Sequence, residues 1–171
     1  SAASDVYKRQ DLDHTIFVVA SKSGGTVEVK SFESYFWAKA LARKSNKIDQ
    51  AGKQFIAITD PDTELYRRSV ANKYRKTFVN PGDIGGRYSA LSLFGLVPAA
   101  LLGVDVEALL GSGRRKATAC QNWVAAENPG ARLGAQMAAW AHAGRDKLTL
   151  IMSPELSSLG SWIEQLVAES T

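Results

Sequence analysis

The chain has 171 residues, 45% of them hydrophobic, and a formal net charge of +4 at pH 7. This length and apolar content are typical of one globular domain with a buried core, and no apolar run reaches the ~18 residues that a membrane-spanning helix needs. The basic residues are spread out apart from two short clusters, at 73–76 and 114–116, so we expect neither nucleic acid nor a membrane as a partner.

The cysteine and histidine content excludes two further classes of site. Cys120 is the only cysteine, which rules out a disulfide within the chain and favours a reducing, cytoplasmic setting. No cluster of histidine, cysteine and carboxylate residues has the spacing of metal ligands, and no serine lies in a GxSxG turn. We therefore expect no metal site.

The first ten residues, SAASDVYKRQ, fit no element of the pattern that follows. They have no hydrophobic period and resemble translated adapter sequence, so we interpret residues 1–10 as a non-native scar. Residues 11–171 are then one partial domain, and we expect the natural chain to continue at both ends.

Apolar runs alternate with helical patterns along residues 11–171. Ile16 begins four successive apolar residues, which predicts a strand buried on both faces, and Val29, Phe32, Phe36 and Ala40 predict a helix face that lies on the sheet. The predicted strands are 11–20, 54–59, 76–79 and 147–153. The predicted helices are 26–44, 64–73, one that follows residues 85–89 and runs through 101, 106–110, 129–143, and one that begins at Ser153 or at Ser157-Ser158 and runs to the C-terminus.

Residues at the predicted helix ends support these assignments. Asp62, Asp105 and Asn128 can cap the helices that follow them, Pro98 should kink the helix that contains it, and Gly144 can end another. Strands that alternate with helices predict an α/β three-layer sandwich with a mainly parallel sheet, flanked by helices and truncated at both ends. Ligands of such folds bind beyond the carboxyl ends of the strands.

A loop rich in glycine and hydroxyl groups, Ser-Lys-Ser-Gly-Gly-Thr at 21–26, lies at one such end. Its glycines let the backbone approach an anion, and the first N–H groups of the following helix point toward it. Ser21, Ser23 and Thr26 add hydroxyl donors, and Lys22 adds a positive charge. The loop predicts a phosphate site, although a plain strand-to-helix turn has the same pattern.

Two charged side chains are candidates for catalysis. Arg87 follows Gly85 and Gly86, which allow tight backbone packing and bring a guanidinium near a helix start, where it suits an oxyanion; a surface salt bridge is the alternative. Glu169 and Gln165 lie four residues apart beside the apolar stripe of the last helix. Partial desolvation there would make Glu169 a better base, whereas an ordinary exposed glutamate is the alternative.

These segments together resemble glucose-6-phosphate isomerase, a family with the sugar isomerase (SIS) fold. The segment DIGGRYS at 83–89 is similar to the family's GGR[FY]S signature, ASKSGGT at 20–26 to its sugar-phosphate loop, and WIEQLVAEST at 162–171 to the segment with its catalytic glutamate. The runs GGRYSALSLFGLVPAALLGVD and SLGSWIEQLVAEST look most like the isomerase half of bifunctional transaldolase/glucose-6-phosphate isomerase proteins.

The resemblance implies a role for each candidate residue. Ser21, Lys22, Ser23 and Thr26 would hold the phosphate of the sugar, and Gln165 would contact the substrate. Arg87 would stabilise a cis-enediolate, and Glu169 would move the proton between C2 and C1 of glucose 6-phosphate and fructose 6-phosphate. The reaction needs no cofactor.

The chain also departs from the family's pattern. Many relatives have threonine where Gly25 stands. The family's Gly-Lys pair, later histidine and C-terminal lysine, and an earlier glycine-rich segment do not occur in these 171 residues. The histidine typically reaches across a dimer, so the resemblance implies a homodimer for the full-length protein and weak or no activity for this segment alone. The alternative function is a non-catalytic SIS module that binds a sugar phosphate as a regulator.

Overall fold

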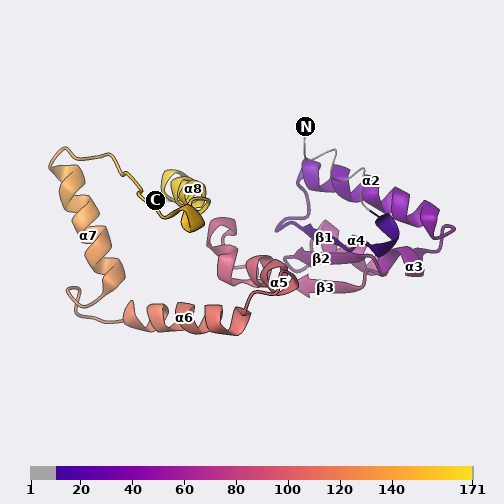
Figure 1. Cartoon of the computed structure of the whole chain (residues 1–171), viewed down its shortest axis with the longest axis horizontal. Helices are drawn as coiled ribbons and strands as arrows, with labels where there is room; N and C mark the ends of the chain where they lie inside the picture. Colours follow the sequence, from indigo (N-terminus) through magenta and orange to yellow (C-terminus); the bar gives the residue numbers. More distant parts are fainter. Residues whose placement is uncertain (1–10, 171) are drawn as a thin grey trace. The chain divides into compact units, whose positions relative to one another are not determined.

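The computed structural model describes residues 11–170 and divides the chain into two compact units, one ending at Leu102 and the other beginning at Gly103 (Figure 1). The first unit contains η1 (Leu12–His14), β1 (Phe17–Ala20), α2 (Val27–Arg43), α3 (Ile48–Gly52), β2 (Phe55–Thr59), α4 (Glu64–Ala71), β3 (Lys76–Val79), η2 (Gly86–Leu91) and α5 (Leu93–Leu101). The second contains α6 (Val106–Ala119), α7 (Pro129–His142), η3 (Pro154–Leu156) and α8 (Leu159–Ser170).

The sheet of the first unit has three parallel strands in the order β1-β2-β3. Phe17 pairs with Phe55, and Ile56 pairs with Lys76. All five residues of β2 are buried, because this strand has a neighbour on each side and helices on both faces. The predicted strands at 54–59 and 76–79 are confirmed, and so is the parallel α/β class.

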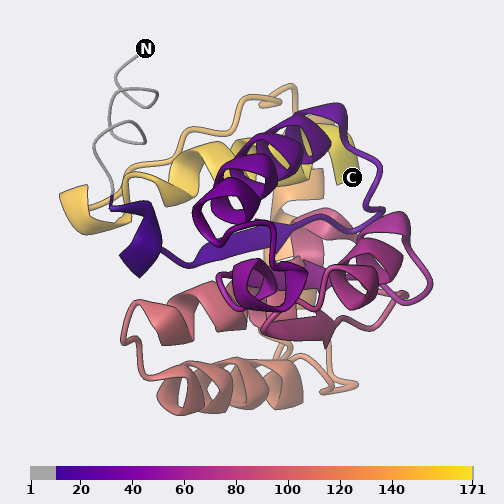
Figure 2. The ribbon, with the colours of Figure 1, turned by 90° about the vertical axis from the view of Figure 1, so that its right-hand side faces the viewer.

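Helices cover both faces of the sheet. Val19, Phe55 and Ala57 point toward α2, α3 and α4 and share a core with Ala40, Ala51, Leu65 and Tyr74. The ring of Phe17 stacks between those of Phe36 and Phe55, at 4.8 and 4.9 Å between centroids. Alternation along β2 turns Ile56 and Ile58 to the other face, where α5 packs against the strand. Figure 2 shows α2 above the strands of this layered unit.

A buried ion pair joins α2 to α4 within this core. The Glu33 carboxylate accepts two hydrogen bonds from the Arg68 guanidinium, at 3.2 and 2.6 Å, and one from the Tyr74 hydroxyl at 2.8 Å. Burial, followed by the negative charge of Glu33, raises the pKa of Tyr74 well above its usual value. Arg68 neutralises the buried Glu33 carboxylate and Tyr74 donates a hydrogen bond to it. Together they offset the cost of burying this charge.

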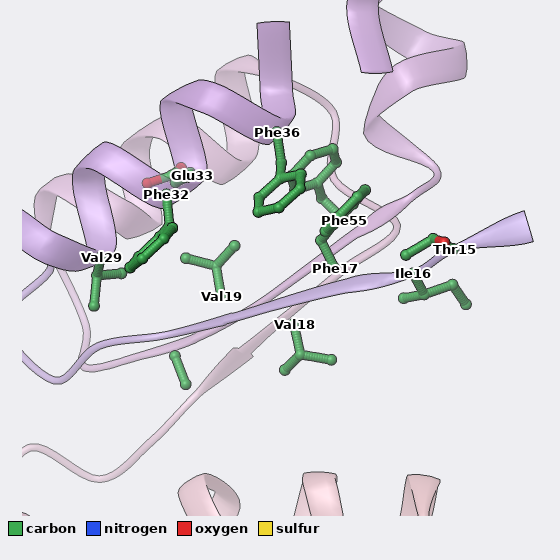
Figure 3. A pocket seen from close by; sticks show the side chains of 11 residues that line it. Thr15, Ile16, Phe17, Val18, Val19, Val29, Phe32, Glu33, Phe36 and Phe55 are labelled. Carbon is green, nitrogen blue, oxygen red and sulfur yellow. The ribbon is translucent and has the colours of Figure 1, made fainter. Parts of the chain in front are cut away.

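β1 differs from the prediction in length and burial. It begins at Phe17, because η1 occupies Leu12–His14, and it lies at the edge of the sheet. Among the described residues, β1 has a neighbouring strand on one side only and Val18 points away from α2 (Figure 3), and Ile16 and Val18 are 46% and 38% exposed. The prediction that this strand is buried on both faces is wrong for that reason.

An open groove of about 460 Å³ lies between β1 and α2. Figure 3 shows Phe17 and Val19 on the side of β1 that faces α2, whereas Val18 points away from the helix. Val29 and Phe36 pack against the core and Ala40 is buried, as predicted, but Phe32 is 62% exposed at the groove. The apolar face of α2 is therefore only partly covered in the described chain.

Side chains cap the starts of four of the described α-helices, α4, α5, α6 and α7. Asp105 accepts a hydrogen bond from the Ala108 N–H, and Asn128 accepts two at the start of α7, as predicted. Thr63 caps α4 in place of Asp62, because Asp62 takes a left-handed turn conformation with φ of 59°. Ser92 caps α5 and so separates it from η2, and the predicted helix through Leu101 therefore begins at Leu93.

The second unit is entirely helical in its regular structure. α6 extends to Ala119, well beyond the predicted end at 110, and no residue of α6, α7 or α8 is buried. The predicted strand at 147–153 is absent, and these residues have no regular structure. A strand requires a hydrogen-bonded neighbour, and the described residues of this unit contain none.

Candidate functional site

The loop at 21–26 connects β1 to α2 and gathers its hydroxyl groups within a few ångströms. The buried Ser21 Oγ accepts a hydrogen bond from the Gly24 N–H at 3.1 Å and lies 3.5 Å from the Thr26 Oγ1. The Ser23 Oγ accepts one from the Gly25 N–H at 3.2 Å. Thr26 is the N-cap residue of α2, but its side chain makes no cap hydrogen bond. The structure thus brings three of the predicted phosphate ligands together at a helix start.

Gly24 fixes the course of this loop. Its φ is +68°, a conformation that favours glycine, and a Cβ at this position would lie 2.7 Å from the backbone N of Leu65. The loop therefore passes directly over the first turn of α4. By contrast, a Cβ on Gly25 would meet only the Ser23 Oγ, at 3.6 Å.

Lys22 connects the loop to the ends of the other two strands. Its ammonium forms an ion pair with Asp60, which follows β2, and donates a hydrogen bond to the Gly82 carbonyl, after β3, at 2.9 Å. Its own carbonyl accepts from the Asp60 N–H at 3.3 Å and the Thr59 hydroxyl at 3.4 Å. The three carboxyl-end loops of the parallel sheet therefore meet at Lys22.

Arg87 lies in the first unit too, at the start of η2. The side chain is half-buried, and η2 begins at Gly86 with Gly85 as its N-cap residue. The predicted tight packing is found at Gly85 but not at Gly86. A Cβ on Gly85 would lie only 3.3 Å from the Tyr88 ring, whereas one on Gly86 would meet nothing within 4 Å. Gly86 therefore leaves open space directly before Arg87.

Gln165 and Glu169 belong to α8, in the second unit. They lie one helical turn apart, as predicted, and both are exposed. The partial desolvation predicted for Glu169 is not seen in the described chain. Because the two units are placed independently, the approach of Glu169 to the loop at 21–26 stays a prediction.

Other features of the described residues do not compete with this site. Residues 11–170 contain no group of three or more histidine, cysteine or carboxylate side chains that could hold a metal ion. Within the same range, no helix is long and apolar enough to cross a bilayer. The groove beside β1 is lined by none of the predicted site residues.

Comparison with known proteins identifies the family. The family model for phosphoglucose isomerase matches residues 1–171. The chain belongs to the phosphoglucose isomerase family. A glucose-6-phosphate isomerase from Carboxydothermus hydrogenoformans is 34% identical over 164 residues, which are 92% of this chain and 34% of that protein. One from Methanocaldococcus jannaschii is 32% identical over 167 residues, 96% of this chain and 40% of that protein.

A solved structure supports the fold assigned to this family member. A hypothetical protein from Thermus thermophilus aligns with 99% of this chain and 40% of its own, with a TM-score of 0.86 and 27% sequence identity. The chain therefore spans about a third to two fifths of the length of the relatives that it matches.

Sequence reasoning missed two contributors to this region, Asp60 and the Gly82 carbonyl. Asp60 lies directly after the predicted strand at 54–59. This position is a usable signal, because the carboxyl ends of parallel strands meet at one edge of the sheet. A backbone carbonyl such as that of Gly82 carries no signal in the sequence.

Proposed function

We propose that this chain is part of an enzyme that interconverts glucose 6-phosphate and fructose 6-phosphate. The observation that carries the proposal is the hydroxyl-rich loop at the start of α2, in a chain that matches the isomerase family along its length. The phosphate of the sugar binds to Ser21, Ser23 and Thr26, and the first N–H groups of α2 add their partial positive charge.

The chemistry is a proton transfer next to a carbonyl group. In the open-chain aldose, the Glu169 carboxylate removes the proton from C2, and the C–H electron pair forms the C1–C2 double bond. The carbonyl π electrons move to O1, which gives a cis-enediolate. A proton passes from O2 to O1, the C2 carbonyl forms, and Glu169 returns its proton to C1 to give the ketose.

The remaining residues serve this transfer. The Arg87 guanidinium lies beside the enediolate oxygens and stabilises the negative charge that develops there. Gln165, one turn from Glu169, hydrogen-bonds to the sugar. The substrate's own carbonyl acidifies the adjacent C–H, so the scheme uses no cofactor. Catalysis in this form suits a cytoplasmic enzyme of glycolysis and gluconeogenesis, and we expect the whole protein to be a homodimer.

Replacement of the base tests the scheme. We expect Glu169→Gln, in the chain expressed within its complete reading frame, to lower kcat by about three orders of magnitude while substrate binding is retained. Glu164→Gln is the matched control, because Glu164 is exposed on the same helix, and it should leave kcat unchanged. The measurement is conversion of glucose 6-phosphate to fructose 6-phosphate.

The same assay decides between the enzyme and the regulatory alternative. A wild type that binds sugar phosphate but isomerises nothing would favour the non-catalytic SIS module, because a sensor has no use for a base. We expect the 171-residue chain alone to turn over weakly or not at all, and normal turnover by this chain would contradict that expectation.

A further inference from the structure

We propose that the ion pair of Lys22 and Asp60, here called the strut, sets the distance between the phosphate loop at residues 21–26 and the segment leading to Arg87. Both are then positioning residues, and the ammonium of Lys22 does not bind the phosphate itself. This inference rests on the proposed function, because it assigns a spacing role within that site.

The first argument concerns the surroundings of Asp60. Its side chain is 14% exposed, and its Oδ1 is buried without a hydrogen-bond partner among the described residues. The other oxygen, Oδ2, is paired with the Lys22 ammonium. A carboxylate so far removed from water is stable only beside its counter-ion, and removal of one partner from such a pair is costly. Asp60 therefore retains the ammonium at the strand ends.

The second argument concerns the geometry of Lys22. Its carbonyl is fixed by Thr59 and Asp60, and its ammonium reaches both Asp60 and the Gly82 carbonyl. The backbone and the side chain of one residue thus connect all three loops. A Cβ on Gly82 would lie 3.8 Å from the Pro61 ring, so the second and third loops are in contact as well.

The position of Gly82 links the Lys22–Asp60 ion pair to the segment that carries Arg87. Gly82 lies shortly before the turn at Gly85 and Gly86, which presents Arg87. The phosphate loop is held at the other end of the Lys22 side chain. A ligand that contacts only the loop is then insensitive to the strut, whereas a ligand that reaches from the loop to Arg87 depends on it.

Two probes of different length test the inference on the chain expressed within its complete reading frame. Inorganic phosphate occupies the loop alone, and 6-phosphogluconate carries a phosphate at one end and a carboxylate at the other. We expect Lys22→Met and Asp60→Asn each to change the affinity for phosphate by less than about twofold. The same variants should lower the affinity for 6-phosphogluconate by about tenfold. Titration of the Gly24 and Gly25 amide resonances reports both affinities.

Matched variants separate positioning from a general loss of structure. Lys22→Arg keeps a cation in reach of Asp60 and should restore most of the 6-phosphogluconate affinity. Asp62→Asn makes the same chemical change on an exposed side chain of the same loop and should alter neither affinity. The double variant of Lys22→Met and Asp60→Asn should be no weaker than either single variant, since both remove one interaction.

Three results would overturn the inference. If Lys22→Met weakens both probes equally while Asp60→Asn tightens them, Lys22 is a direct phosphate ligand that Asp60 holds back. If the double variant loses the sum of the single effects, the two residues act separately. If the wild type binds neither phosphate nor 6-phosphogluconate, the strut does not position a binding site and the inference is wrong. A wild type that binds both probes but isomerises nothing in its complete reading frame refutes the proposed function alone.

Discussion

Two adjacent glycines in the loop at 21–26 differ in whether a side chain could replace their hydrogen. Gly24 has a φ of +68°, and its missing Cβ would meet the backbone N of Leu65 at 2.7 Å. Gly25 has no such constraint, since only the Ser23 Oγ lies near its missing Cβ, at 3.6 Å. The space at Gly25 would therefore admit a larger side chain such as threonine.

Alanine at each position measures the difference. We expect Gly24→Ala to lower the free energy of unfolding by about 1–3 kcal/mol, because it adds backbone strain and a clash with a helix start. Gly25→Ala is the matched control and should stay within about 0.5 kcal/mol of wild type. Urea denaturation measures both values, and equal losses from the two variants would contradict this account of the loop.

The sequence predicted the membership of the phosphate loop but not its connections. Ser21, Ser23 and Thr26 are neighbours in the chain, so their proximity follows from local backbone geometry. The pairing of Lys22 with Asp60 joins residues in the loops that follow two different strands, and it depends on the register of β1 against β2. Glu169 lies in the second unit, so neither local backbone geometry nor the register of the strands fixes its position.

At the scale of elements, an acid–tyrosine contact joins Glu33 of α2 to Tyr74, which follows α4, and this contact has a defined pH dependence. Burial and the charge of Glu33 raise the pKa of Tyr74 above its unfolded value near 10. Above pH 10 the unfolded chain loses this proton while the folded chain keeps it. The folded state is then favoured less as the pH rises.

We therefore expect the first unit to lose stability above pH 10, by at most about 1.4 kcal/mol per pH unit from this group. Tyr74→Phe should be less stable at pH 8 and should show a shallower decline above pH 10. Tyr35→Phe, on an exposed ring of α2, is the control and should retain the wild-type slope. Thermal denaturation at several pH values gives the slopes, and an unchanged slope in Tyr74→Phe would count against a shifted tyrosine.

Elements whose signals are local were predicted well, and those that need a partner were not. The apolar run of β2 and the caps Asp105 and Asn128 act within a few residues, and the structure has them as predicted. The segment 147–153 has the composition of a strand but no strand beside it, so its apolar alternation produced no sheet. Ile16, just before β1, and Val18 within it are exposed, since β1 lies at the edge of the sheet and Val18 points away from α2 (Figure 3).

At the scale of the whole molecule, a large apolar surface faces solvent. Trp123 is fully exposed, Ile151 is 95% exposed, and Leu133, Trp140 and Leu148 are exposed as well. The helices α6, α7 and α8 contain no buried residue, which is unusual for amphipathic helices of a stable unit. Surface of this kind is covered in folded proteins by other parts of the chain or by a partner.

We expect the isolated 171-residue chain to dimerise or aggregate for this reason. Light scattering after size-exclusion chromatography should show a species larger than the monomer mass of 18.5 kDa, with a fraction that grows with concentration. Trp123→Lys together with Ile151→Lys should shift the chain toward monomer. A monodisperse monomer of the unchanged chain at high concentration would contradict the expectation.

The central place of β2 also orders the events by which the first unit assembles. β2 meets β3 across a shorter stretch of chain than it meets β1, and α4 lies within that stretch. Closing the shorter loop costs less chain entropy, so we expect β2, α4 and β3 to come together first and β1 to dock afterwards. The loop at 21–26 extends from β1, and the contacts of Lys22 involve the ends of all three strands. We therefore expect the candidate site to be the last part of this unit to acquire its shape.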